Sequence, residues 1–268
     1  MKVSVLATGS KGNSTYIASS KAQILIDLGT TSLYVEKQLK DATVDPKNIQ
    51  AIVITHTHVD HINGLKVFIK KYNPTIYLTD KMYKEVSLTI PNFNYYIIDG
   101  DFDIEDIHFT VFKTSHDASD SNGYIIENNN RSIVYITDTG YINQKNHHLL
   151  QNKNLYIMES NHDVKMLMNG HYPYQIKQRI LGDKGHLSNK DSSFYLSKFI
   201  GKDTKTVILI HLSHDNNDPD IALQTLKDEL KNNDILFDNI LISSQSERTD
   251  LIEVWLKLFV LVKLRKII

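Results

Sequence analysis

Apolar residues occur along this chain in short runs of five or six positions, separated by turns rich in Gly, Asn, Asp and Ser. Runs of this length, rich in Val, Ile and Tyr, are typical of β-strands. They predict strands at residues 2–7, 14–19, 23–28, 51–55, 75–79, 108–113, 123–127, 132–137, 155–160, 206–211 and 239–243.

Longer segments between these strands carry apolar residues at intervals of three and four, which is typical of amphipathic helices. The predicted helices cover residues 32–40, 64–72, 82–88, 174–181, 190–199 and 220–231. Strands come first in each half of the chain, which favours two sheets packed face to face with helices outside over a single parallel sheet. The polar stretch "ENNNR", residues 127–131, predicts a hairpin turn between two strands.

The chain has no Pro-, Gly- or Ser-rich linker and no internal repeat, so we predict one α/β (α+β) domain over residues 1–254. An apolar and basic extension, residues 255–268, follows it. Lys257 and Lys263 leave only residues 258–262 between them, so we expect no integral membrane span. Two interpretations of the extension stay open: a terminal strand or helix packed on the domain or a partner, and an interfacial helix that touches a membrane.

The amino-acid composition limits which kinds of catalytic or metal site the chain can form more than it limits where in the cell the protein acts. The chain has 268 residues, 41% of them hydrophobic, and a formal net charge of -1, so the overall charge gives no indication of nucleic-acid or membrane binding, and any anionic substrate requires a local site. Because cysteine is absent, disulfides, thiolate nucleophiles and sulfur-bound metals are excluded, and the twelve histidines become the main candidates for chemistry. The N-terminal apolar run is shorter than that of a secretory signal, and we expect a cytoplasmic location.

One histidine motif stands directly after the predicted strand 51–55: His56, His58, Asp60 and His61. At a strand end, a tight turn lets such side chains converge on one point, which a metal ion requires. Imidazole and carboxylate groups suit zinc, manganese or iron. Chance is a poor explanation for three histidines and an aspartate at this spacing, so the motif predicts a metal site.

Three more candidate ligands each follow an apolar strand: His116, Asp138 and His211. Taken singly they are weak evidence, because a lone histidine is usually structural and Asp138 in "TDTG" suits a turn or helix cap equally well. Together with the histidine motif they make a set large enough for two metal ions.

This arrangement resembles the metallo-β-lactamase-fold hydrolase superfamily. The resemblance implies a four-layer αββα sandwich of two mixed β-sheets flanked by helices, with the metals at one edge between the sheets. The stretches "LATGSKGNSTYI", "TDTGY", "ESNHD", "KQRILGDKGHLSN" and "HLSHDNN" are similar to the WalJ/YycJ-type branch, from about Lys2 to Val254. That similarity implies a metal-dependent 5′-to-3′ DNA exonuclease, whereas the C-terminal extension has no counterpart in it.

The resemblance also implies roles for the candidate ligands. His56, His58 and His116 would hold one divalent ion (zinc or manganese, with iron as a further option). Asp60, His61 and His211 would hold the other, Asp138 would bridge both, and a water between the ions would be the nucleophile. Asp60, next to that water, would also orient it as a catalytic residue.

The leaving group and the substrate need further residues. His186, in the Gly-rich "GDKGHLSN", is the candidate proton donor, although it would equally suit a cap for the following helix, and Lys184 would add charge beside it. The "TGSKGNST" loop, with Ser10, Asn13 and Ser14, is either an anion cradle or an ordinary turn.

Two further expectations concern the surroundings of the site. His162 and Asp163 are expected to support ligand histidines by fixing their tautomers. The segment between Asp138 and His211 is too short for the large cap domain of the RNA-processing nucleases of the superfamily. We therefore expect an open cleft with recognition by the nearby basic residues Lys11, Lys177, Arg179 and Lys184.

Two alternatives stay open. The first is another hydrolase, because the same ligands would serve a glyoxalase-type thioesterase, a lactonase or a small cyclic phosphodiesterase. The second is a non-enzymatic metal-binding regulatory module, and the complete set of candidate ligands argues against it. We expect DNA rather than RNA as the partner, and a homodimer is a further expectation.

Overall fold

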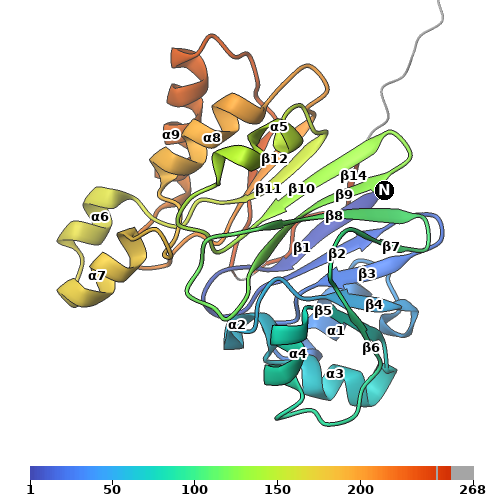
Figure 1. Ribbon diagram of the computed structural model, residues 1–268. Helices are drawn as coiled ribbons and strands as arrows, with labels where there is room; N and C mark the ends of the chain where they lie inside the picture. Colours follow the sequence, from blue (N-terminus) through green and yellow to red (C-terminus); the bar gives the residue numbers. More distant parts are fainter. Residues whose placement is uncertain (246, 255–268) are drawn as a thin grey trace, which may run out of the picture.

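Two seven-stranded β-sheets packed face to face form the centre of the molecule (Figure 1). The computed structural model describes residues 1–245 and 247–254. Sheet one contains, in spatial order, β14 (Ile252–Glu253), β1 (Lys2–Ala7), β2 (Ser14–Ala18), β3 (Gln23–Ile26), β4 (Ala51–Val53), β5 (Thr75–Leu78) and β6 (Tyr95–Ile97). Sheet two contains β13 (Ile240–Ile242), β12 (Thr206–Ile210), β11 (Leu155–Glu159), β10 (Arg131–Ile136), β9 (Asn122–Asn128), β8 (Ile107–Lys113) and β7 (Phe102–Ile104).

Both sheets are mixed. Strands β3 to β6 run parallel, as do β10 to β13, and the remaining neighbours are antiparallel. The carboxyl ends of parallel strands lie at one edge of a sheet, and ligands of α/β proteins bind there. The predicted ligands follow β4, β8, β10 and β12, so the topology brings residues far apart in sequence to a common edge.

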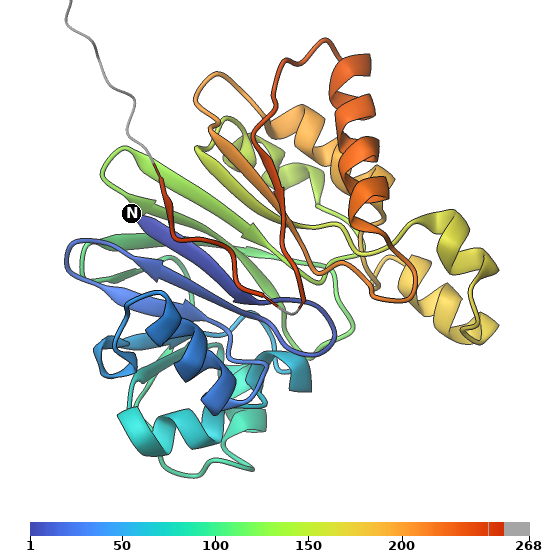
Figure 2. The same cartoon turned by 180° about the vertical axis from the view of Figure 1, so that it is seen from behind.

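Helices cover the two outer faces (Figures 1 and 2). On sheet one these are α1 (Ser32–Asp41), α3 (Leu65–Tyr72) and α4 (Asp80–Val86). On sheet two they are α5 (His147–Leu150), α8 (Asn189–Phe199) and α9 (Pro219–Asn232). The helices α6 (Val164–Asn169) and α7 (Tyr174–Leu181) project from one end of the sandwich, α2 (Val59–Ile62) follows β4, and short 3₁₀ helices occupy Pro46–Asn48 and Gln144–Asn146.

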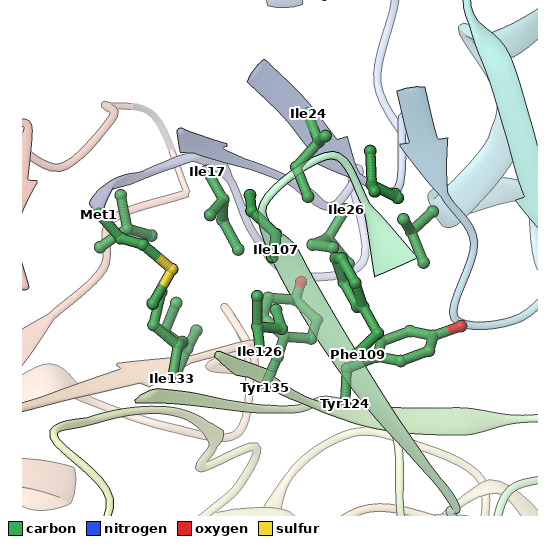
Figure 3. Packing of buried hydrophobic residues seen from close by; sticks show 14 of the residues in the cluster. Met1, Ile17, Ile24, Ile26, Ile107, Phe109, Tyr124, Ile126, Ile133 and Tyr135 are labelled. Carbon is green, nitrogen blue, oxygen red and sulfur yellow. The ribbon is translucent and has the colours of Figure 1, made fainter. Parts of the chain in front are cut away.

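The main core lies between the sheets (Figure 3). Along β3, Ile24 and Ile26 point into this core, whereas Leu25 packs under the helices of the outer face. Both faces of the strand are therefore buried, which explains why its sequence is apolar without alternation. From sheet two, Phe109 and Tyr124 contribute their rings to the same core, where each buried large side chain contributes about 1.5–3 kcal/mol.

The structure confirms the predicted αββα sandwich, its eleven predicted strands and its six predicted helices, with ends that differ by a few residues. The turn of "ENNNR" is confirmed as the β9–β10 hairpin, with Asn129 in the left-handed conformation. The elements β6, β7, β14, α2, α5 and α6 were not predicted, because they are too short to show a period. The predicted extension, residues 255–268, lies outside the described residues, among which no helix has the length and apolar character needed to cross a membrane.

Candidate metal centre and active site

Three histidine rings meet at one point, near the ends of β4 and β8. The Nδ1 of His58 lies 3.1 Å from Nε2 of His56 and 3.2 Å from Nε2 of His116. His116 donates from its other nitrogen, Nδ1, to the carbonyl oxygen of Gly185, so its Nε2 presents a lone pair. Nitrogens that converge in this way are better suited to a shared cation than to hydrogen bonds with one another.

A second group of donors lies beside the first and comes from both sheets. The Oδ2 of Asp60 lies 3.7 Å from Nε2 of His61 and 3.9 Å from Nε2 of His211. Both histidines are buried, whereas 27% of the Asp60 side chain is exposed, so Asp60 faces an open pocket. One carboxylate and two imidazoles suit a divalent cation of the first transition series or zinc.

Asp138 connects the two groups. Its Oδ2 lies 3.1 Å from Nε2 of His61, and its Oδ1 lies 3.8 Å from Nε2 of His116. Burial by itself raises the pKa of Asp138, but the neighbouring His211 and His61 outweigh burial and hold this pKa well below its usual value. A buried carboxylate that stays charged needs positive partners. The Oδ2 of Asp138 faces His61, whereas its Oδ1 lies between His116 of the first group and His211 of the second, 3.4 Å from Nδ1 of His211.

Three residues at strand ends share an unusual backbone conformation. Asp27 after β3, Asp138 after β10 and His211 after β12 have φ angles of 58°, 50° and 57°. This left-handed conformation costs about 1–2 kcal/mol for a residue with a Cβ, and Asp and His are among the residue types that adopt it most readily. In a strand, side chains point alternately to the two faces of the sheet. The sharp turn breaks this pattern and points each of these side chains toward the site.

Asp27 holds His61 in place from within sheet one. Its Oδ2 accepts a hydrogen bond from Nδ1 of His61 at 2.7 Å, while its Oδ1 accepts from the backbone N–H of Thr55 at 2.8 Å. Burial by itself lowers the pKa of His61, but the charges of Asp27 and Asp138 raise it well above its usual value. Because Nδ1 is committed to Asp27, Nε2 of His61 faces Asp60 and Asp138.

Glu159, the last residue of β11, has the corresponding position in sheet two. Its Oε1 accepts from Nδ1 of His186 at 2.7 Å and from Nδ1 of His211 at 3.0 Å, and its Oε2 accepts from the backbone N–H of Thr139 at 3.0 Å. Burial by itself raises the pKa of Glu159, but His186 and His211 outweigh burial and lower it to about 2. Sequence reasoning assigned no role to Asp27 or Glu159; the available signal was an acidic residue at the end of an apolar strand, in "ILID" and "YIME".

His186 lies between α7 and α8 and lines the pocket with 18% of its side chain exposed. Its Nδ1 donates to Glu159, so its other nitrogen, Nε2, is left to meet a substrate. Burial by itself lowers the pKa of His186, but the Glu159 carboxylate raises it to about 9. The alternative role as a helix cap is wrong, because Ser188 caps α8 by accepting from the N–H of Asp191 at 3.1 Å.

The loop that precedes β2 supports the backbone of two candidate ligands. Thr8 accepts at Oγ1 from the N–H of His211 at 2.7 Å, and the N–H of Asn13 donates to the carbonyl oxygen of Asp60 at 2.8 Å. A Cβ at Gly29 would lie 1.5 Å from that same oxygen of Asp60, so only glycine allows this close approach.

Of the three substrate-binding residues predicted in this loop, one lines the pocket and two are buried. Ser10 lines the pocket. Asn13 is buried, with Nδ2 3.0 Å from Nε2 of His61, and Ser14 is buried and donates to the carbonyl oxygen of Asp27 at 3.0 Å. The structure therefore does not bring Ser14 to the substrate side, since its hydroxyl supports the residue that holds His61.

The pocket over the two groups has a volume of about 370 Å³, within the range of small-molecule sites. Helix α7 forms one wall with Ile176, Ile180 and Arg179, and Nε of Arg179 donates to Oδ2 of Asp117 at 2.6 Å. The other basic residues expected here lie elsewhere. The Nζ of Lys177 donates to the carbonyl oxygens of Met168 and Gly170, and neither Lys184 nor Lys11 is among the pocket's described lining residues.

The expectation that His162 and Asp163 support ligand histidines is wrong. Asp163 caps α6 by accepting from the N–H of Met166 at 2.9 Å. His162 is only 1% exposed, neither ring nitrogen has a hydrogen-bond partner in the described part of the chain, and burial lowers its pKa to about 4. Asp27 and Glu159 fix the histidine orientations instead.

The donor set fits divalent metal ions. Its buried carboxylates, Asp138 and Glu159 in sheet two and Asp27 in sheet one, raise the pKa values of His61, His186 and His211, so their negative charge is balanced only while these imidazoles hold an extra proton. Uncompensated buried charge is costly, and a cation between the converging oxygens and nitrogens removes that cost.

A family model described as a beta-lactamase superfamily domain matches residues 22–212, which is more than half of the chain. The chain belongs to the beta-lactamase superfamily. Two curated superfamily relatives are similar over most of their length. The chain is 36% identical to the exodeoxyribonuclease YycJ of Bacillus anthracis over 233 residues, covering 85% of this chain and 88% of the relative. It is 35% identical to the exodeoxyribonuclease WalJ of Streptococcus pneumoniae over 246 residues, covering 87% and 90%.

Solved superfamily structures share the fold at lower identity. The metallo-beta-lactamase fold protein YhfI from Bacillus subtilis superposes with a TM-score of 0.69 at 17% identity, covering 93% of this chain and 99% of that one. The short form of human tRNase Z gives a TM-score of 0.65 at 16% identity, covering 96% and 100%. These likenesses show a metallo-β-lactamase fold.

Proposed function

We propose that this chain is a metal-dependent nuclease that removes nucleotides from the 5′ end of DNA. The convergence of two groups of donors on a shared Asp138, beside the His186–Glu159 pair, is the observation that carries the proposal. The exodeoxyribonuclease names of both curated relatives support DNA as the substrate. Metal dependence agrees with the close grouping of His56, His58 and His116 and of His56, His61 and Asp138.

In this proposal the two groups hold two divalent ions, zinc or manganese, with iron as a further option. The first ion would be held by His56, His58 and His116. The second would be held by Asp60, His61 and His211, and Asp138 has oxygens near both groups. Such ions supply activation of water and neutralisation of charge on a phosphate.

The chain's own residues carry the remaining steps. Asp60, at the pocket surface, orients the attacking water, and His186 gives a proton at Nε2 to the oxygen that leaves phosphorus. Glu159 keeps the His186 ring in the orientation that points Nε2 into the pocket. Ser10 and Arg179 line the same pocket and bind phosphate oxygens.

The test is hydrolysis of 5′-phosphorylated single- and double-stranded DNA with added manganese or zinc. Asp60→Ala is expected to abolish cleavage, His186→Ala to slow the chemical step by about 100-fold or more, and the exposed His148→Ala to behave as wild type. A metal-loaded wild type that cleaves no DNA but turns over a thioester, a lactone or a cyclic phosphodiester would replace the nuclease with another hydrolase of the same site. We further propose that residues 1–254 form one domain and that the chain forms a homodimer. Light scattering of the full chain measures the oligomeric state.

A further inference from the structure

A second cavity adjoins the metal pocket. It has a volume of about 580 Å³ and lies between the loop before β2, the loop between β12 and α9, and the segment after β13. Leu212 and Ser213 line both cavities, so the two cavities adjoin at these residues. We call it the lateral groove; its described lining residues are Lys11, Leu212, Ser213, His214, Asn217, Asp218, Pro219, Ile242, Ser243, Ser244 and Gln245.

The walls of the lateral groove offer hydrogen-bonding groups and a positive charge. Ser243 is only 4% exposed, yet its Oγ has no hydrogen-bond partner among the described residues. Buried hydroxyls are normally paired, so an unpaired one at a cavity wall indicates a missing polar partner. Lys11 adds an ammonium group, and His214 adds an imidazole that is 77% exposed.

The acidic residues near the groove are engaged in local contacts. Asp218 caps α9, accepting from the N–H groups of Asp220 and Ile221 at 2.8 and 3.3 Å. Asp215 accepts from the hydroxyl of Tyr172 at 3.0 Å and lies 3.1 Å from Nδ1 of His214. The carboxylates are therefore directed at other protein groups, and the positive charge of Lys11 is left to meet a ligand.

The composition of the walls favours a sugar–phosphate backbone over a base. Bases in single-stranded nucleic acids stack on aromatic side chains, and the described lining of this groove contains no Phe, Tyr or Trp. Hydroxyl, amide and ammonium groups instead match the oxygens of phosphate and sugar. The wall of the metal pocket formed by α7 and Tyr172 has the apolar side chains Ile176 and Ile180 and an aromatic ring, which suit a terminal nucleotide.

We propose that the lateral groove binds the backbone of the DNA strand that continues past the scissile phosphate. This inference rests on the proposed nuclease function and deepens it. The terminal nucleotide lies against α7, the phosphate that is cleaved lies over the metal centre, and the rest of the strand leaves past Ser213 and Lys11. The strand therefore ends at a wall on one side and runs on through a groove on the other, which is the layout that an exonuclease requires.

The test compares a long and a minimal substrate in the full chain. The double variant Lys11→Ala/His214→Ala is expected to lower kcat/KM for a long 5′-phosphorylated single strand by about tenfold, mainly through KM, since two side chains that bind charged oxygens are removed. Hydrolysis of bis(p-nitrophenyl) phosphate, which is too small to reach the groove, should stay within about twofold of wild type. Lys37→Ala, an exposed lysine on α1, is the matched control and should leave both rates unchanged.

A binding measurement separates this inference from the nuclease assignment. Fluorescence anisotropy of a labelled single strand, recorded with the metal removed by a chelator, needs no cleavage. The double variant should bind more weakly, with a log–log salt slope smaller by about 0.7 for each phosphate that the variant no longer neutralises.

Each outcome has a distinct meaning. Weaker binding by the double variant supports the groove even if the wild type cleaves no DNA, in which case the nuclease proposal fails alone. Normal cleavage and unchanged DNA affinity in the double variant would overturn the groove. An equal loss on bis(p-nitrophenyl) phosphate and on the long strand would overturn it as well, because Lys11 and His214 would then support the metal centre itself.

Discussion

The two sheets support the site in different ways. In sheet one, Asp27 orients a single histidine, His61, and shares its remaining hydrogen bonds with Thr55. In sheet two, Glu159 orients two histidines at once through one oxygen, His211 on the candidate metal side and His186 on the candidate proton-donor side. Under the proposed function, the sheet-one half would support metal binding alone, whereas the sheet-two half would couple metal binding to proton transfer.

The two carboxylates also differ in electrostatics. Burial dominates at Asp27 and raises its pKa, even though His61 and Thr55 oppose the change. At Glu159 the two histidines outweigh burial and lower the pKa to about 2. Burial therefore outweighs the single imidazole at Asp27, whereas two imidazoles outweigh burial at Glu159.

The largest effect is expected from Glu159→Gln. Because supporting partners of this kind are worth about 10–100-fold each and Glu159 supports two histidines, activity should fall by about 1000-fold. Steady-state kinetics on 5′-phosphorylated DNA measures this loss. Equal losses of activity in Glu159→Gln and Asp27→Asn would contradict the proposal that Glu159 supports two functional histidines and Asp27 only one.

Removal of the metal should destabilise both halves together. Each ion that binds only the folded chain, at a free concentration about 1000 times its dissociation constant, contributes about 4 kcal/mol. For a chain of this size that corresponds to a fall in Tm of about 8–16 °C for each ion that a chelator removes. Differential scanning calorimetry with and without EDTA measures it, and an unchanged Tm would argue against metal at the buried carboxylates.

Asp27→Asn tests the sheet-one half alone. The change removes the acceptor that fixes the His61 tautomer, so activity should fall by about 10–100-fold. Metal content measured by elemental analysis should drop from two ions toward one, because Asp27 contacts His61 directly and is connected to His56 of the other group through the hydroxyl of Thr55. Retention of both ions would show that His61 keeps its orientation without Asp27.

The smallest effect concerns acid stability near Glu159. His162 is buried with its pKa lowered from 6.5 to about 4, so the folded state binds fewer protons than the unfolded state between these values. The contribution to stability is fully present above about pH 6.5 and is lost as the pH falls toward about 4, by on the order of 3 kcal/mol. Urea unfolding of the metal-free chain across this range should show a shallower decline for His162→Leu, and parallel curves would contradict it.

Much of the fold could be predicted because most of its strands and helices are specified by residues that are close together in the sequence. Strands such as β3 and β12 are apolar on both faces and are bounded by turn residues, so a short window of sequence reveals them. Strand β6 was missed because its three residues are partly exposed and show no alternation. The β9–β10 hairpin was found because a polar turn stands between two apolar runs.

The sequence by itself determined the ligand types and the places where they leave the strands: four of them stand within six positions, and each of the others follows an apolar run. It did not determine which side chains hold those ligands. Asp27 is 34 positions from His61, and Glu159 is 52 positions from His211, and nothing in a local window links such pairs. Only the tertiary structure decided these contacts, because parallel strands end at a common edge and sharp left-handed turns aim their terminal side chains at one point. The same packing decided that Ser14 supports Asp27 and that Lys11 lies beside the lateral groove, since both outcomes depend on which loops face each other across the sandwich.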